Sequence, residues 1–545
     1  MESQQQTHVK QSPRKRGLSS FAIFGFTILG CAILLAPSIL WDFAYDQGTF
    51  AYGGSAILRG AKPYLDFWDI KPPNIFYVYA LAFRWFGESV RAIRFFDFLN
   101  ALTTIALIYL LTVRLFATAT WRRRAAVVAS LAFVLQYYIQ GFWNTAQVET
   151  YSLPLILLAI WLLFNAKPHR KISTFRIVLS GLLLSLTFFF KFTNGIYLAV
   201  GLSALWLRDP KDWRPRLRES VWLSGTFGVG LLVQMIVMLI NGELLPLWHI
   251  TTSSTLQYSS TNFSGSLSVV QNLRTALSAL DIIWVGLATI GWIVWLIKKK
   301  FKDSRDLSRS VIFLLVAALL SVVAVQVQNK GYTYHYTILL PWAAILIGTG
   351  IVLAVQALAS LRAPESNPMH EAVMNAMTAF VLVVLFALST IFTSSAELGS
   401  AAVGFYDVVM SNREANGYIA TDTLSNYVLK NTAPSDRIFV FGFEPYVYWK
   451  TKRTPATRFL NTIHFKPTYT APEERAELVH SLTSNPPKLF LVETRDRYTS
   501  QGDSPDDSRT VISKRFPELE SLLATHYTSR DTIKGVIAYF SNAQH

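Results

Sequence analysis

The sequence has few of the residues that soluble enzymes use for redox or nucleotide chemistry. Its 545 residues include one cysteine, Cys31, which has no partner for an intramolecular disulfide. Charged residues make up only 15% of the chain. It contains no HExxH, CxxC, GxxxxGK(S/T) or GxSxG motif. These absences argue against a nucleotide-driven pump and give no support to dinucleotide binding.

Long apolar runs dominate the chain instead. Hydrophobic residues make up 52% of it, and several runs approach or exceed the roughly 18 residues that span a bilayer. The net charge of +16 would suggest nucleic acid binding in a soluble protein. Here the basic residues lie mostly in short loops between apolar runs, which is the positive-inside pattern. We therefore expect a polytopic α-helical membrane protein with no nucleic-acid partner.

The apolar runs predict eleven membrane passages. They lie near residues 20–40, 92–115, 124–141, 150–165, 176–190, 193–207, 219–240, 277–297, 310–328, 337–357 and 373–394. The first run follows basic residues but is too long for a signal peptide and lacks a clear cleavage site, so we expect it to be retained. The prediction is a cytoplasmic tail at 1–19 and a transmembrane domain at 20–394, with a first outer loop at 41–91.

Basic loops predict the orientation of the chain. Clusters of lysine and arginine follow the second, fourth, sixth and eighth passages, whereas the loops between carry almost none. These clusters are Arg122–Arg124, Lys167–Arg176, Lys211–Arg218 and Lys298–Arg305. Together with the N-terminal tail they alternate onto one side, which is expected to be cytoplasmic. An odd number of passages then places residues 395–545 outside.

Two segments need a choice between alternatives. Residues 176–207 are short for two crossings, but one long helix would break the charge alternation of every later loop. We therefore predict a hairpin of two short helices with Lys191 at its tip. Residues 72–86 are apolar but only about fifteen long, and we place them in the outer interface as an amphipathic helix. Asp69 can cap this helix, Pro72 suits its first turn, and Gly87 can end it.

The C-terminal part of the chain differs in composition from the apolar runs before it. The segments DRIFVFGFE, KLFLVET and IKGVIAYFS have the composition of buried strands, and APEERAELVHSL is typical of a helix. This alternation predicts a small extracytoplasmic α/β domain within residues 395–545.

The first outer loop holds an unusual number of charges for the mouth of a membrane helix. Asp42 and Asp46 share a face if the first helix continues, and Asp66 and Asp69 follow. Lys71 precedes the helix start at Pro72, where free N–H groups and the helix dipole favour a phosphate. Interfacial capping by the aspartates and snorkelling of Lys71 to lipid headgroups are the alternative interpretations.

Other outer loops add polar groups on the same side of the membrane. They supply Glu149 before the fourth passage, Lys191 at the hairpin tip, His249 after the seventh passage, and Lys330, His335 and Tyr336 near the tenth. Singly, each is typical of interfacial anchoring or structural pairing. Together, carboxylates, lysines and aromatic rings on one face indicate a site for an anionic, amphipathic, sugar-bearing ligand.

Several of these stretches carry a family resemblance. An aspartate closely follows the first apolar run in AYDQGTFAYGG, and the pattern GxxPYxDFWDxKPP spans Gly60 to Pro73. AQVET precedes the fourth passage, NKGYTYHYTILLP forms a late outer loop, and Asp436–Phe459 lies in the tail. These stretches resemble the GT-C superfamily of membrane glycosyltransferases, particularly its bacterial branch similar to aminoarabinose transferases and protein O-mannosyltransferases. The likeness covers most of the chain, and the first loop is its most specific part.

The resemblance implies a GT-C fold of about 11 transmembrane helices with a small C-terminal α/β domain. It also implies inverting transfer of a hexose or pentose from a polyprenyl phosphate to an envelope lipid, protein or glycan outside the bacterial cytoplasmic membrane. On matching positions, Asp46 would be the catalytic carboxylate and Lys71 a ligand of the donor phosphate. The other candidates are Lys191 and Lys330 for the phosphate, and Asp42, Asp66, Asp69, Glu149, His249, His335 and Tyr336 for sugar or acceptor.

One departure from the family bears on metal binding. Many members have Asp-Glu where this chain has Asp46 followed by Gln47. A second acidic role would therefore fall to Asp69 or Glu149, and a divalent cation, Mg²⁺ or Mn²⁺, stays open as a cofactor.

Two other function classes stay open. A transporter or flippase for lipid-linked sugars would favour ionisable groups inside the membrane helices and helices broken at the midplane. The clustering of polar groups at one surface argues against it. A non-catalytic assembly subunit built on the same fold is the third interpretation.

Overall fold

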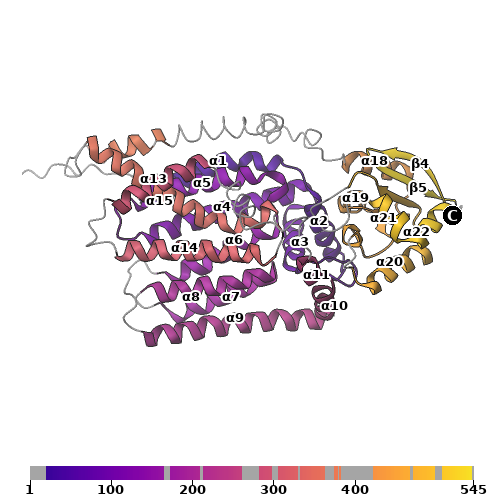
Figure 1. Cartoon of the computed structure of the whole chain (residues 1–545), viewed down its shortest axis with the longest axis horizontal. Helices are drawn as coiled ribbons and strands as arrows, with labels where there is room; N and C mark the ends of the chain where they lie inside the picture. The colour runs from indigo at the N-terminus through magenta and orange to yellow at the C-terminus, as the bar shows by residue number, and fades with distance from the viewer. Residues whose placement is uncertain are drawn as a thin grey trace, which may run out of the picture.

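The chain forms a helical bundle with a mixed α/β domain at one end (Figure 1). The structure, a computed structural model, describes residues 20–164, 172–208, 213–260, 282–297, 305–328, 330, 332–362, 373–378, 380–381, 421–466, 470–496 and 506–542. Short helices of the first loop and of residues 244–260 lie between the bundle and the sheet (Figure 1). Most of the candidate site residues predicted from the sequence lie in this region between the two parts.

Ten apolar helices of the described chain build the bundle. They are α1 (Ser20–Leu35), α4 (Val90–Leu115), α5 (Arg122–Asn144), α6 (Val148–Leu163), α7 (Thr174–Phe188), α8 (Tyr197–Arg208), α9 (Trp213–Asn241), α13 (Ile282–Ile297), α14 (Arg305–Gln326) and α15 (Leu340–Arg362). Six spans are long and apolar enough to cross a membrane, and four shorter apolar helices accompany them. The polytopic helical fold predicted from the sequence is confirmed.

The predicted hairpin over residues 176–207 is confirmed. Helix α7 ends at Phe188, a 3-10 turn η2 (Phe192–Ile196) follows, and α8 begins at Tyr197. Lys191 lies at the tip between the two helices. Most of the predicted eleventh passage at 373–394 lies outside the described residues. So do the N-terminal tail and most of the basic loops at 167–176 and 298–305.

The first loop contains a helix that the sequence analysis missed. Helix α1 is followed by a 3-10 turn η1 (Ala36–Leu40), extended residues, and then α2 (Tyr45–Leu58). The first helix does not continue through Asp42 and Asp46, because Pro37 tightens the chain and residue 41 is extended. The two glycines in AYGGSAIL lower helix propensity and hid α2 in the sequence.

The predicted interfacial helix exists as α3 (Asn74–Phe86). Gly87 ends it with a positive φ of 82°, as expected. The expected cap by Asp69 is wrong, since Pro73 is the N-cap and no side chain caps this helix. Asp69 Oδ1 instead accepts the backbone N–H of Lys71 at 2.8 Å. Asp69 therefore shapes the loop that carries Lys71 rather than the helix that follows.

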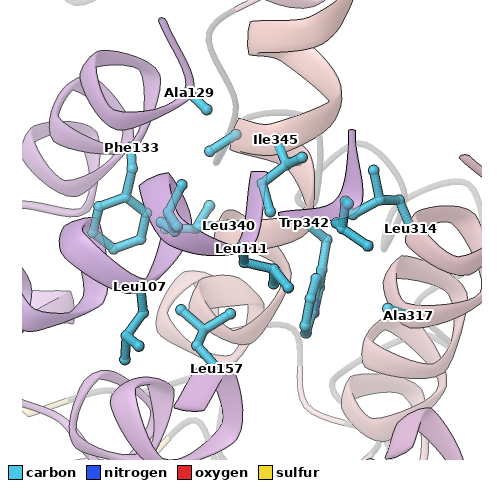
Figure 2. Packing of buried hydrophobic residues seen from close by; sticks show 14 of the residues in the cluster. Leu107, Leu111, Ala129, Phe133, Leu157, Leu314, Ala317, Leu340, Trp342 and Ile345 are labelled. Carbon is cyan, nitrogen blue, oxygen red and sulfur yellow. The ribbon is translucent and has the colours of Figure 1, made fainter. Parts of the chain in front are cut away.

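The bundle packs around α15. Apolar side chains from α4, α5, α6, α14 and α15 gather in one cluster (Figure 2). In the span that contains α15, 94% of the most apolar window is buried, compared with 17% for the span at α1. Gly348 allows α15 to approach the backbone of α5, a small-residue contact typical of membrane helices.

A five-stranded mixed sheet forms the C-terminal domain. The strands are β1 (Arg437–Phe441), β2 (Thr454–Pro455), β3 (Leu489–Glu493), β4 (Tyr527–Ile533) and β5 (Val536–Ser541), in the order β2-β1-β3-β5-β4. Strands β2, β1 and β3 are parallel, and β5 and β4 are antiparallel. The predicted strands at β1, β3 and β5 are confirmed; β4 was missed because its burial pattern is almost wholly exposed.

Helices surround this sheet. They are α18 (Thr421–Asn431), α19 (Pro445–Thr451), the turn η5 (Ile463–Phe465), α20 (Pro472–Ser484), α21 (Ser508–Arg515) and α22 (Pro517–His526). The helix predicted from APEERAELVHSL is α20. Residues 395–420 of the predicted domain lie outside the described residues.

The C-terminal domain is docked on the first loop. One apolar cluster contains residues of both, including Phe50 and Phe76 from α2 and α3 and Val447 and Trp449 from α19. Gly48 makes the contact between α2 and α19 close, because a Cβ added there would lie 2.9 Å from the backbone nitrogen of Tyr446. Because the two parts share a core and their backbones approach closely, we treat the contact between them as an integral part of the fold.

We predict that Gly48→Ala destabilises the protein although alanine favours a helix. The added methyl group meets backbone, and such overpacking costs about 1–3 kcal/mol. The matched control is Gly25→Ala in α1, where no atom lies within 4 Å. Thermal unfolding in detergent measures both variants. Equal melting temperatures for the two would contradict the described packing of α19 on α2.

Candidate active site

A cavity of about 860 Å³ opens where the bundle, the first loop and the C-terminal domain meet. Its lining comes from the start of α2, residues 69–72, the turn between α5 and α6, the tip of the α7–α8 hairpin, and residues 251–259. Residues 327, 328, 330 and 332–335 and four residues of the C-terminal domain complete it. Here η3 (Thr251–Thr255) is a π-helical turn between α10 (Leu244–Ile250) and α11 (Leu256–Ser260). The cavity is large enough for a sugar phosphate.

Asp46 and Lys71 form an ion pair that faces this cavity. Lys71 Nζ lies 3.2 Å from Asp46 Oδ1, and Gln147 Nε2 donates to Asp46 Oδ2 at 3.3 Å. Asp46 lies in the first turn of α2, where the helix dipole favours a carboxylate. The Lys71 ammonium also lies 5.1 Å from the centroid of the Phe50 ring. Gln147 thus holds Asp46, the Phe50 ring contacts Lys71, and both charged side chains still line the cavity.

Electrostatics keep Lys71 charged. Burial would lower the pKa of Lys71, but the carboxylates of Asp46 and Asp69 outweigh burial and raise it above its usual value. Burial raises the pKa of Asp69, and the charge and backbone N–H of Lys71 oppose this. A permanently charged ammonium in a partly buried loop is suited to binding a phosphate.

A second ion pair also lines the cavity. Lys191 Nζ contacts Glu149 Oε1, and Glu149 is almost fully buried in the first turn of α6. Burial lowers the pKa of Lys191, although the Glu149 carboxylate opposes this. The second oxygen of Glu149, Oε2, is buried and has no hydrogen-bond partner in the described structure. This carboxylate therefore retains an acceptor for a ligand.

Lys330 and His335 complete the polar lining. His335 Nδ1 lies 3.1 Å from the carbonyl oxygen of Lys330, so Nδ1 carries the proton and donates. The Lys330 ammonium lies 4.1 Å from the centroid of the Tyr258 ring. The cavity lining thus holds three lysines and three carboxylates, which balance in formal charge. They are Lys71, Lys191 and Lys330 with Asp46, Asp69 and Glu149.

Four of the predicted site residues are outside the cavity lining. Asp66 is exposed and accepts the backbone N–H of Lys62, and His249 is also exposed. Tyr336 is fully buried in the apolar core of the bundle. Asp42 lies next to the Trp41 side chain of that core, and its carbonyl accepts a hydrogen bond from Arg94. Their predicted position in outer loops did not suffice to place these four in the cavity.

Other lining residues were missed by the sequence analysis. Gln147 belongs to the AQVET motif, but only its acidic neighbour was noticed. Asn461 and His464 line the cavity from the C-terminal domain, in a stretch with no catalytic motif. Only the resemblance of the preceding segment, Asp436–Phe459, pointed to this part of the chain.

The carboxylates of the lining do not fit a divalent cation. Asp46 is paired with Lys71, Asp69 accepts a backbone N–H beside the same lysine, and Glu149 is paired with Lys191. Within the described part of the chain, no three histidine, cysteine, aspartate or glutamate side chains are arranged to hold a metal ion. We therefore derive no step through Mg²⁺ or Mn²⁺.

Comparisons with known proteins bear on the fold that holds this cavity. The family described as dolichyl-phosphate-mannose-protein mannosyltransferase matches residues 70–240. The structure of ArnT from Cupriavidus metallidurans bound to undecaprenyl phosphate matches with a TM-score of 0.59 and 15% identity, over 94% of this chain and 98% of that one. Its apo structure matches with a TM-score of 0.60 and 14% identity, over 94% and 97%. The chain has the GT-C fold.

The resemblance drawn from the first-loop motifs is therefore confirmed at the level of the fold. Arabinofuranosyltransferase AftD from Mycobacteria is a more distant match, with a TM-score of 0.48 and 13% identity over 97% of this chain and 40% of that one. No curated protein sequence matches the chain.

Gln47 has a structural part in this GT-C fold. Its side chain is fully buried, and its Nε2 group donates to the carbonyls of Phe142, Trp143 and Thr145 at 3.1, 3.2 and 2.7 Å. Its Oε1 accepts the backbone N–H of Ala44 at 3.0 Å. An amide supplies both donor and acceptor, whereas an ionised glutamate supplies acceptors alone. The departure from Asp-Glu thus fastens the start of α2 to the α5–α6 turn.

Helix α4 holds the same turn from the other side. Arg94 donates to the Thr145 hydroxyl at 3.1 Å and to the Phe142 carbonyl at 2.9 Å. Asp97 Oδ2 accepts the backbone N–H of Ala146 at 3.1 Å, where the chain has a positive φ of 53°. These contacts fix the turn that presents Gln147 to Asp46.

We predict that Gln47→Glu destabilises the protein by about 1–3 kcal/mol or more. A carboxylate would face and repel three carbonyl oxygens, and the Thr145 carbonyl would lose its donor. A buried unpaired group carries a cost of that order. Thermal unfolding measures the loss, with Gln257→Glu at an exposed position as the matched control. Unchanged stability of Gln47→Glu would show that the amide does not fasten this turn.

Proposed function

We propose that the chain is an inverting glycosyltransferase that uses a polyprenyl-phosphate sugar as donor. The observation that carries this proposal is the Asp46–Lys71 pair, which faces a cavity lined by further lysines and aromatic rings. The pair supplies a base for an acceptor hydroxyl and a cation for a phosphate. The matched ArnT structure contains undecaprenyl phosphate, which supports this donor class.

Donor binding would free the base. In the resting site the Lys71 ammonium is paired with one Asp46 oxygen and Gln147 donates to the other, so both acceptor oxygens are occupied. The phosphate of the donor competes with Asp46 for the Lys71 ammonium. Once Lys71 turns to the phosphate, Asp46 keeps the amide of Gln147 and can accept a hydrogen bond from the acceptor hydroxyl.

The transfer step then balances in atoms and charge. The acceptor oxygen bonds to the anomeric carbon on the face opposite the phosphate while the bond from that carbon to the phosphate oxygen breaks. Asp46 takes the hydroxyl proton, and the departing phosphate keeps the electron pair. Lys71 stabilises the charge that builds on the phosphate, which favours the transition state over the ground state. Backside attack inverts the anomeric centre.

The site is proposed to lie on the outer face of a bacterial cytoplasmic membrane. The short basic loops support a cytoplasmic N-terminus, and an odd number of passages would put the C-terminal domain outside. We keep the proposed division into a tail at 1–19, a membrane domain at 20–394 and an outer domain at 395–545. The acceptor would be an envelope lipid, protein or glycan that reaches this face.

Asp46→Asn is expected to lower transfer by at least 10²–10⁴-fold, the usual contribution of a general base. The variant keeps the size of the side chain and one acceptor oxygen for Lys71 or Gln147, so the fold should survive. The measurement is transfer of radiolabelled sugar in proteoliposomes, from a panel of undecaprenyl-phosphate hexoses and pentoses to an extract of envelope lipids and glycans. Asp436→Asn, on an exposed loop of the C-terminal domain, is the matched control.

The same assay separates the proposal from its alternatives. Consumption of one donor by the wild type and by Asp436→Asn alone supports the enzyme and identifies the labelled acceptor. Equal turnover in Asp46→Asn would remove Asp46 from the mechanism. Movement of sugar lipids between leaflets without consumption would move the function to transport.

Lys71→Ala is expected to weaken binding of undecaprenyl phosphate about 10- to 100-fold, the range for one lost charge-assisted hydrogen bond. Affinity is measured in nanodiscs at low salt. The matched control is Lys62→Ala, an exposed lysine of the same loop. Asp46→Asn removes the competitor of the phosphate and should bind this lipid at least as tightly as the wild type. Equal affinities for Lys71→Ala and Lys62→Ala would refute a phosphate role for Lys71.

A further inference from the structure

The C-terminal domain gives the cavity a wall without charge. Four of its described residues line the cavity, namely Phe443, Asn461, Ile463 and His464. The rest of the lining carries the two ion pairs of Asp46 with Lys71 and Glu149 with Lys191. The proposed transfer reaction uses only the charged wall and leaves the polar groups of the neutral wall without a part.

Two polar atoms of this neutral wall have no partner. Asn461 is 3% exposed, and its Oδ1 makes no hydrogen bond in the described structure. The Nδ1 atom of His464 is likewise buried and unpaired. Most buried polar side-chain atoms in proteins are hydrogen-bonded, and leaving one unpaired has a cost. Two such atoms within one short segment of a cavity wall indicate a ligand that would satisfy them.

The neutral wall is held rigidly in place. The His464 ring packs edge-on against Trp68, with centroids 5.1 Å apart, and against Tyr258 at 6.0 Å. Trp68 is itself fixed, because its Nε1 donates to Glu474 Oε1 at 2.8 Å. Next to Asn461, Thr462 bonds to both backbone groups of Gly442 at the end of β1. A preorganised pair of polar groups is what a specific subsite requires.

The His464 imidazole is neutral. Burial, together with the positive charges of Lys71 and Lys330, lowers the pKa of His464 to about 3. The ring therefore offers a neutral donor or acceptor throughout the physiological pH range. The influence of Lys71 also indicates that this wall lies near the proposed phosphate seat.

We propose that Asn461 and His464 form a subsite for the hydroxyl groups of a sugar ring. A hydroxyl both donates and accepts, so it can satisfy an amide oxygen and an imidazole nitrogen side by side. The subsite rests on the proposed glycosyltransferase function and deepens it, because it would select which sugar is used. The ring would belong either to the donor or to a glycan acceptor, and the experiment below distinguishes the two.

The first arm of the experiment measures binding and needs no turnover. Nanodiscs containing the wild type are titrated with undecaprenyl phosphate and with its glucose, mannose, arabinose and aminoarabinose esters. Asn461→Ala and His464→Phe are compared with it; the second keeps a ring against Trp68 and Tyr258. A donor subsite predicts that each variant loses about 2- to 10-fold in affinity for the preferred ester and binds the bare lipid normally. His480→Phe and Asn485→Ala, both exposed in the same domain, are the matched controls.

The second arm measures transfer as a function of acceptor concentration. A subsite for the acceptor predicts that KM for a glycan acceptor rises about 2- to 10-fold in both variants while the binding of all donor lipids stays unchanged. Either pattern supports the subsite and assigns the sugar ring. Melting temperatures identify a variant that fails to fold, and the other variant then decides.

Two outcomes overturn the subsite. One is unchanged donor affinity and unchanged acceptor KM in both variants. The other is an equal loss of affinity for the bare lipid and its esters, which would show a structural role only. Failure of the proposed function is a different result, because a wild type that transfers no sugar still reports sugar preference in the first arm. A wild type without preference in either arm also overturns the subsite.

Discussion

Buried polar groups of the first loop form hydrogen bonds with distant parts of the chain. These hydrogen bonds hold the segments that line the cavity in place. Gln47 is bonded to the α5–α6 turn, and Trp68 to Glu474 at the start of α20. Glu474 also accepts the hydroxyl of Ser254, so one carboxylate joins three segments. Leaving any of these groups unpaired would carry a cost comparable to a sizeable part of a domain's stability. These hydrogen bonds fix the first loop against the other segments that line the cavity.

This arrangement gives charged and neutral lining residues to different parts of the chain. Charged groups come from segments anchored in or beside the bundle, where a lipid phosphate would arrive from the membrane. Neutral polar groups come from the α/β domain, which lies farthest from the bundle helices (Figure 1). If the proposed roles hold, a change in the C-terminal domain would alter the choice of sugar and leave the phosphate chemistry intact. Such a division suits a fold that serves many substrates.

Much of the bundle could be predicted from the sequence because membrane helices are specified by apolar length and flanking charge. The hairpin at Lys191 and the strands β1, β3 and β5 followed from such local patterns. The first-loop motif also pointed to Asp46 and Lys71, which the structure brings within 3.2 Å. Asp66, His249 and Tyr336 could not be placed in this way, because side-chain direction depends on tertiary packing. Asn461 and His464 could not be found from the sequence, because the aromatic neighbours of His464, Trp68 and Tyr258, come from distant parts of the chain.

The resting contact between Asp46 and Lys71 has a consequence for the end of the proposed reaction cycle. After transfer, Asp46 would hold the proton of the acceptor, and Lys71 would face a phosphate monoester with nearly twice the charge of the donor's diester. Loss of that proton restores a carboxylate beside the bound phosphate. Asp46 then competes for Lys71 again and repels the anion it helped to release. Re-forming the Asp46–Lys71 pair would therefore promote release of the product lipid phosphate. Because the pair re-forms only after Asp46 loses its proton, proton release would complete each turnover.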